Sequence, residues 1–285
     1  DKQTKLTMNT KNNNFQFSRL LMVMRWDMFT NLKSYLNMML GMTFALLPFF
    51  IMQLYQLSKQ DQLSPDTIDL SYWGMSQYVL MISSIAMYMM ATQIFMVMKT
   101  TGQREQFLML PASNLEKYIS RFLFSTLGAA VAMITAIVVS DLVQLIFSFV
   151  LLPGHHQSVC LSIMALLWKI WTTFIESIDS AGALMLSLLI MTCGVLVHSF
   201  FILCGTLFRK HTIVVSGILF IVMIYLVIYV IESVPGTITT CLMHGDNSWI
   251  FCLLIAELLL AGFQYWLSYK VFTRMQVICN RWINL

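Results

Sequence analysis

The sequence predicts an all-α integral membrane protein with six transmembrane helices and both termini in the cytoplasm. Three observations support this fold class: the composition, six apolar segments of spanning length, and an uneven distribution of basic residues. Of the 285 residues, 58% are hydrophobic and 11% are charged, whereas an ordinary soluble domain has about 25% charged residues. A soluble fold of this size could not bury so much apolar surface.

Six segments are long and apolar enough to cross a bilayer, because about 20 helical residues span about 30 Å of hydrocarbon. They are Leu36 to Tyr55, Trp73 to Met98, Phe122 to Leu145, Ala183 to Phe208, Ile213 to Ile231 and Trp249 to Phe272. We expect one membrane domain. It would consist of a polar tail at 1–14, an interfacial helix at 15–35, the six spans between 36 and 272, and a cytoplasmic tail at 273–285.

The basic residues predict the orientation of these spans. Of 17 Lys and Arg residues, all except Lys59 and Lys169 fall on one side of the predicted bilayer. Loops rich in Lys and Arg stay in the cytoplasm, so this side, which also holds both chain ends, is predicted to be cytoplasmic. The basic residues form no continuous block of the kind that binds nucleic acid.

The segment before the first span has an amphipathic pattern. Apolar residues recur there at three- and four-residue spacing, at Phe17, Leu21, Met24, Met28 and Leu32. We expect a helix from Phe15 to Tyr35 that lies at the cytoplasmic interface. An amphipathic lead-in without a partner is the alternative.

The inner loop between the second and third spans is too apolar to be a hydrated connector. Its sequence, KTTGQREQFLMLPASNLEKYISRF, contains an apolar run from Phe107 to Leu110 that something must cover. Pro111 is expected to end a short helix, since it lacks an N–H group and disfavours helical geometry in the preceding residue. Ser113 and Glu116 form a capping-box pattern, which predicts a new helix that runs into the third span.

The segment from Phe147 to Ser180 is longer than a connector between two spans requires. Its apolar stretch, Val159 to Trp171, is flanked or interrupted by polar and helix-breaking residues. We expect an outer interfacial or re-entrant helix here. An additional outer span is the less favoured alternative, because it would disturb the alternation of charge.

No catalytic motif is present. The chain has no phosphate-binding GxxxxGK[ST] loop, no HExxH zinc helix and no GxSxG elbow, which argues against an autonomous ATPase or protease. His155 and His156 are adjacent and cannot share a helical face, so a solvated pair is favoured over a metal site. We expect no metal and no cofactor in this chain. The six cysteines form no CxxC pair, although an oxidising exterior would permit a disulfide between Cys160 and Cys241.

Two acidic residues within spans are candidates for a translocation pathway, because an intramembrane charge is costly and tends to face protein or water. Glu257 lies eight residues after Trp249, about 12 Å inside the outer boundary. It would line a pathway or bond another helix. Asp141 lies 19 residues beyond Phe122, about 29 Å along a helix, and is expected to reach the outer headgroups.

This arrangement resembles the permease subunit of a bacterial ABC transporter of the type-2 exporter class, over most of the chain. Phe15 to Tyr35 resembles the connecting helix of that family. GQREQFLMLPASNLEKYISR resembles its cytoplasmic coupling helix, with the acidic residue, leucine-rich turn and proline at Glu105, Phe107 to Leu110 and Pro111. The chain departs from the family pattern in the brief segment between spans five and six, Glu232 to Ser248, and in the long segment between spans three and four. Val234, Pro235 and Gly236 would still support a small re-entrant helix.

The resemblance implies a multi-pass protein of the bacterial cytoplasmic membrane that works with partners. It would pair with a second permease chain, identical or different, and with two separate ABC ATPase subunits that carry ATP and Mg. The coupling residues it implies are Gly102, Arg104, Glu105, Phe107, Leu108 and Pro111. The exposed apolar surface expected at this site is an independent reason to expect a partner.

Two alternatives come from other functional classes. One is a secondary transporter driven by an ion gradient, which would normally contain several intramembrane ionisable residues or paired broken spans. The other is a non-transporting membrane subunit that anchors or senses for a larger complex.

Overall fold

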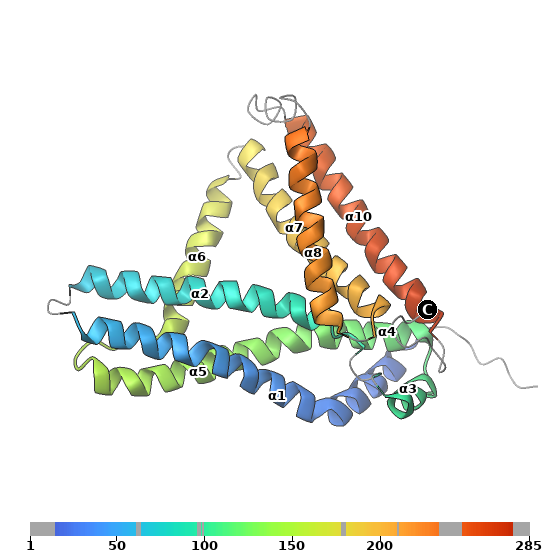
Figure 1. The fold of residues 1–285 in the computed structure, drawn as a ribbon, viewed down its shortest axis with the longest axis horizontal. Coiled ribbons are helices and arrows are strands. Elements are labelled where there is room, and N and C mark those ends of the chain that lie inside the picture. The colour runs from blue at the N-terminus through green and yellow to red at the C-terminus, as the bar shows by residue number, and fades with distance from the viewer. Residues whose placement is uncertain are drawn as a thin grey trace, which may run out of the picture.

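A computed structural model describes residues 15–60, 64–95, 98, 100–177, 181–209, 211–233 and 247–275. This part of the chain is built from helices (Figure 1). In chain order they are α1 (Phe17–Ser58), α2 (Pro65–Ala91), α3 (Thr101–Leu108), α4 (Asn114–Leu123), the π-helical turn η2 (Phe124–Gly128), α5 (Ala129–Leu151), α6 (Val159–Ser177), α7 (Ala181–Leu207), α8 (Thr212–Ser233) and α10 (Asn247–Thr273).

Six helical segments in the described ranges are long and apolar enough to cross a membrane, so the chain is a multi-pass membrane protein by helix length and hydropathy. They are Phe17–Ser58, Asn114–Leu151, Val159–Glu176, Ala183–Leu207, Thr212–Tyr229 and Ile250–Thr273. No more than 17% of each segment's most apolar window is buried inside the protein. Most of these side chains therefore require another apolar environment, such as lipid.

The number of candidate spans agrees with the sequence, but their identity differs at two places. Helix α6 belongs to the set, although an interfacial or re-entrant helix was expected there. Helix α2 does not belong to it, although a second span was predicted from Trp73 to Met98. α2 begins earlier, at Pro65, and ends at Ala91. The helix carries several polar side chains, Ser76, Gln77, Ser83 and Ser84 among them, which lower its hydropathy.

The predicted boundary between an interfacial helix and the first span is absent. α1 is one 42-residue helix that contains Pro48 and continues through Tyr35 and Leu36. Its N-terminal part turns away from the direction of the rest (Figure 1). The three- and four-residue spacing of apolar residues correctly predicted a helix at the start of α1. Nothing in the sequence around Tyr35 and Leu36 ends that helix, so it continues into the apolar segment.

The last three predicted spans agree closely with α7, α8 and α10. The third predicted span is longer than expected, because α4, η2 and α5 follow one another from Asn114 to Leu151. The tails at 1–14 and 276–285 lie outside the described residues. So do Cys241 and most of the predicted re-entrant segment between α8 and α10, while Cys160 forms no disulfide within the described part.

The helices form two groups that meet at one corner. α1, α2 and α5 run side by side, and α7, α8 and α10 run in a second direction, with α6 between the groups (Figure 1). One buried apolar cluster joins α1 and α2 to the segment around the start of α6, and a second joins α3, α4, α7 and α10 to the end of α2. The groups touch closely at Gly205, where an added Cβ atom would lie 2.6 Å from the Thr92 carbonyl oxygen.

Candidate functional site

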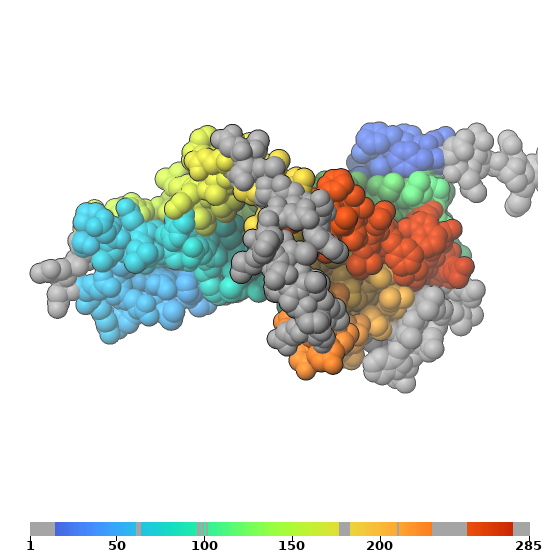
Figure 2. Space-filling model, turned by 90° about the horizontal axis from the view of Figure 1, so that it is seen from above, coloured from blue at the N-terminus to red at the C-terminus, as the bar shows by residue number. Residues whose placement is uncertain are grey.

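The corner where the two groups meet contains the predicted coupling segment. We call it the α3 corner, defined as residues 15–31 at the start of α1, helices α3 and α4, and residues 265–275 at the end of α10. Figure 2 shows the start of α1 lying against α4. The described chain therefore begins and ends at this corner, beside the short helix α3 (Figure 1).

Two capping boxes determine where α3 and α4 begin. The Thr100 hydroxyl accepts a hydrogen bond from the Gln103 N–H group, while the Gln103 side chain accepts one from the Thr100 N–H group. Ser113 and Glu116 make the same reciprocal pair, which confirms the predicted start of the second helix. The short helix, the break around Pro111 and the new helix are thus as the sequence predicted. The Thr-x-x-Gln pattern at Thr100 and Gln103 is also a capping-box signal in the sequence, and it was not used to predict the start of α3.

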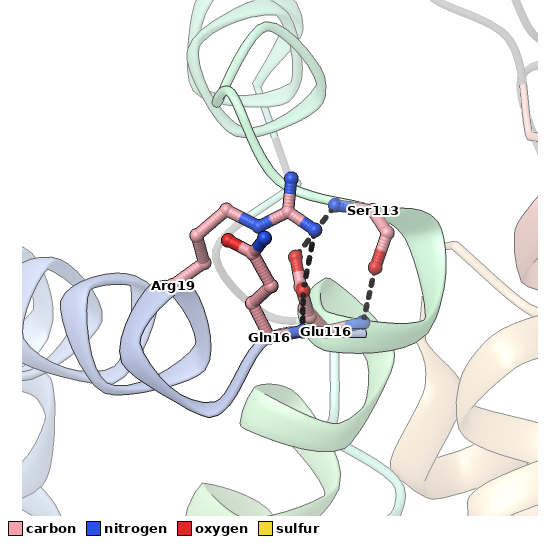
Figure 3. Close-up of polar contacts among 4 residues, drawn as sticks. All are labelled: Gln16, Arg19, Ser113 and Glu116. Carbon is pink, nitrogen blue, oxygen red and sulfur yellow. Dashed lines mark hydrogen bonds and ion pairs between the residues drawn. The ribbon is translucent and has the colours of Figure 1, made fainter. Parts of the chain in front are cut away.

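Glu116 joins the start of α1 to the start of α4. Its fully buried carboxylate accepts hydrogen bonds from the Ser113 N–H group at 2.8 Å, the Gln16 N–H group at 2.7 Å and Nη2 of Arg19 at 3.1 Å. Figure 3 shows these donors converging on the carboxylate. A buried carboxylate needs such donors, because burying a charge without partners is costly. Glu116 is therefore more than a capping residue.

Further contacts fix α3 and α4 to their surroundings. Nζ of Lys117 donates a hydrogen bond to the Leu108 carbonyl oxygen at 2.7 Å, which connects α4 to the last turn of α3. The Tyr118 hydroxyl donates to Oγ of Ser268 at 3.0 Å, which connects α4 to α10. Movement of α3 would therefore be transmitted to α4 and α10.

Phe107 is buried, contrary to the expectation of an exposed apolar surface. None of its side chain is exposed. Its ring centroid lies 6.2 Å from that of Trp26 on α1 and 6.4 Å from that of Phe272 on α10, and the Arg121 guanidinium lies 5.0 Å from the ring. Within the apolar run from Phe107 to Leu110, Phe107 is therefore covered by other helices of the same chain and not by a partner.

The other predicted coupling residues divide by exposure. Arg104 is also buried, with 1% exposed, and lines a cavity of about 380 Å³ beside Gly205 and Arg209. Leu108 is half-buried. Exposed residues form what we call the α3 face: Gly102, Gln103, Glu105, Gln106, Met109 and Pro111. Met109, at 82% exposed, is the most exposed apolar side chain of this face.

A buried ion pair at this corner was not predicted. Nη2 of Arg121 lies 2.7 Å from Oδ1 of Asp27, and both side chains are almost fully enclosed. Asn31 also donates to Oδ1 of Asp27 at 2.6 Å. The residues are 94 positions apart, so no local pattern pairs them. An isolated acid in a largely apolar helical segment was the available signal that Asp27 needs a partner.

Asp141 is enclosed by the protein, and its predicted level near the outer headgroups stays a prediction. It is 5% exposed. Its two carboxylate oxygens accept hydrogen bonds from Oγ of Ser158 at 2.6 Å and from the Val159 N–H group at 2.7 Å. The carboxylate therefore caps the start of α6 from α5, which is a structural role.

Glu257 bonds another helix, which is one of the two roles expected for it. Its Oε2 accepts a hydrogen bond from Oγ1 of Thr192 on α7 at 2.6 Å. One heptad further along both helices, Oγ of Ser199 donates to Oε1 of Gln264 at 2.6 Å. Because residue numbers rise by seven on both helices between the two pairs, α7 and α10 are parallel. Polar pairs of this kind stabilise helix association in membranes.

The part of the chain that the structure describes has no cluster of metal-binding side chains. No group of three or more His, Cys, Asp or Glu residues close enough to hold a metal ion occurs among these residues. His156 instead packs against Phe149, with ring centroids 4.1 Å apart.

The α3 corner is a network of buried contacts around a short helix with one exposed face. Such an arrangement can receive a partner protein and transmit its movement. In comparisons with known proteins, no family model, no curated protein and no solved structure matches this chain.

Proposed function

We propose that this chain is the membrane-spanning permease subunit of an ATP-driven exporter, and that α3 is the contact for a separate ATPase subunit. The observation that carries the proposal is the division of α3 into two sides. Phe107 and Arg104 are buried against the rest of the protein, whereas Glu105 and Met109 are exposed. A short helix held firmly on one side and open on the other is suited to receive force from a partner.

The contacts behind α3 supply a route for that force. Lys117 joins the end of α3 to α4, and the Arg121–Asp27 pair joins α4 to α1. α4 continues through η2 into α5, so displacement of α3 would tilt or rotate a candidate span. π-helical turns such as η2 are frequent at functional sites and permit local adjustment of a helix.

The docking surface proposed here differs from the one that the sequence suggests. Arg104 and Phe107 would stabilise α3 rather than enter the ATPase groove. Gly102, Glu105, Met109 and Pro111 would make the contact. ATP and Mg would be bound by the partner, and a second permease chain would complete the pathway.

The proposed orientation places the α3 corner in the cytoplasm, in the cytoplasmic membrane of a bacterium. The excess of Lys and Arg on this side of the chain supports it. The closeness of the described start of α1 and end of α10 to α3 supports placing both termini on the same side (Figure 1).

The test is co-purification of the complete chain from its native host in mild detergent, with the partners identified by mass spectrometry. We expect a stoichiometric ATPase with a Walker motif. Glu105→Arg and Met109→Asp should each remove it, while Glu176→Arg, an equal charge reversal on an exposed position of α6, should not. Retention of the ATPase by both α3 variants would refute docking at α3, and absence of any ATPase from the native chain under several detergents would refute the exporter.

Glu257 supports a second candidate, a secondary transporter. Its carboxylate is half-buried between α7 and α10 rather than fully enclosed. Ion-gradient-driven uptake into vesicles that contain only this chain would favour that function, and its loss in Glu257→Gln would assign the site. A non-transporting anchor or sensor subunit would show neither this uptake nor substrate-stimulated ATP hydrolysis by a reconstituted complex.

A further inference from the structure

A second cavity lies on the other side of the α3 corner, between α1, the end of α2, the start of α3, and α4–η2. Its volume is about 680 Å³, which falls in the range of about 300–1,000 Å³ typical of small-molecule sites. It is lined by Thr30, Asn31, Lys33, Ser34, Tyr35, Asn37, Met38, Met90, Gln93, Ile94, Thr100, Gln103, Arg121, Phe124, Ser125 and Ala129. None of the functions considered above uses this cavity.

The lining of the cavity mixes polar and apolar side chains, and the charged side chains in it are basic. Among these described residues are two cations, Lys33 and Arg121, together with amides and hydroxyls, and no carboxylate. Asp27 lies behind Arg121 and pairs with one of its nitrogens. The cavity therefore offers hydrogen-bond donors to a ligand, together with Lys33, a cation for which no carboxylate lies in the lining.

Arg121 has binding capacity that the ion pair does not use. It is 3% exposed, and its Nε has no hydrogen-bond partner among the described residues. A buried donor of this kind is costly to leave unsatisfied. The guanidinium fork matches the oxygens of a phosphate group, and Lys33, exposed on α1, would add a second cation to the same group.

The surface next to the cavity is apolar. Leu32, Leu36 and Leu40 on α1 are each about half exposed, and they alternate with Lys33 and Asn37, which line the cavity. The same stretch of α1 thus contributes a cation and an amide to the cavity and presents an apolar strip beside it. A ligand with a phosphate group and hydrocarbon chains matches both, since basic pockets between membrane helices bind anionic headgroups.

We infer that this cavity binds the phosphate-bearing headgroup of an anionic phospholipid, with its acyl chains along the apolar strip of α1. Lys33 and Arg121 contact the phosphate, and the surrounding amides and hydroxyls contact the remainder of the headgroup. The assignment does not depend on the proposed function, and failure to find an ATPase partner leaves it unchanged.

The test uses the complete chain, purified in mild detergent and stripped of lipid. The protein is incubated with equal amounts of phosphatidylglycerol and phosphatidylcholine of the same chain length, and retained lipid is counted by native mass spectrometry. We expect a clear preference for phosphatidylglycerol. Lys33→Gln should reduce this preference about fivefold, since one basic residue near an anionic headgroup contributes about 1 kcal/mol. Lys33→Glu should reduce it further, and Lys33→Arg should retain it.

Arg25→Glu is the matched control, because Arg25 is exposed on the same helix, contacts Phe29 and does not line the cavity. It should leave the preference for phosphatidylglycerol unchanged. Lys33→Glu and Arg25→Glu should both leave thermal stability unchanged. Equal lipid preference in the native chain, or equal losses in Lys33→Glu and Arg25→Glu, would overturn the inference. Displacement of bound lipid by millimolar inorganic phosphate would overturn the lipid assignment and identify a site for free anions.

Discussion

Replacing Phe107 with alanine should destabilise the protein strongly, although the residue lies in a short helix outside the six candidate spans. The ring is fully enclosed and lies against Trp26, Phe272 and the Arg121 guanidinium, so its removal leaves a cavity between three helices and an uncovered guanidinium face. Loss of a buried phenylalanine costs about 3–5 kcal/mol, and the lost contact with Arg121 adds about 0.5–1 kcal/mol or more.

The measurement is the unfolding midpoint in detergent, followed by circular dichroism during heating and during titration with sodium dodecyl sulfate. Met109→Ala, two residues further along at the end of α3, is the control, since its side chain is 82% exposed and its loss should change stability by no more than about 0.5 kcal/mol. Similar midpoints for the two variants would refute the packing of α3 described here. The same reasoning makes Phe107→Asp unsuitable as a docking test, because it would disrupt the corner itself.

Three further predictions concern carboxylates that accept hydrogen bonds or ion pairs from other parts of the chain. Asp27→Asn should cost about 3–5 kcal/mol, because it leaves the buried Arg121 guanidinium without its counter-ion, measured as a lower unfolding midpoint. Asp141→Ala should cost about 3–6 kcal/mol by removing two hydrogen bonds to a carboxylate at the start of α6, and protease cleavage near α6 should become faster. Glu257→Gln should leave the unfolding midpoint nearly unchanged, because the amide oxygen can still accept the hydrogen bond from Thr192.

Each of these has a control. The double variant Asp27→Leu with Arg121→Met should recover most of the lost stability, since replacing a buried pair by apolar residues is often neutral; failure to recover would mean that the pair is not isolated. For Asp141, the control is Asp69→Ala, which removes only an exposed contact with Gln157. For Glu257, a large loss of stability in the glutamine variant would show that the charge itself holds α7 and α10 together.

The start of α4 and the spans α7, α8 and α10 could be predicted because their causes are local. The Ser113–Glu116 capping box and Pro111 act within a few residues, so they placed the break between α3 and α4 correctly. The apolar lengths of α7, α8 and α10 likewise follow from hydropathy alone. The helix does not end at residue 35, because an amphipathic pattern followed by an apolar one does not by itself interrupt a helix.

The sequence by itself determined that the chain is all-α, that it has six helices able to cross a membrane, and that a short helix precedes a capped restart at Ser113. Only the tertiary structure decided which side of that helix is free. Phe107 is buried and Asp27 meets Arg121, because α1 and α10 pack onto α3 and α4 from distant parts of the chain. Arg104 is buried on another side of α3, beside Gly205 of α7. Hydropathy reports the free energy of transferring one residue from water, whereas burial and ion pairing depend on which helices meet.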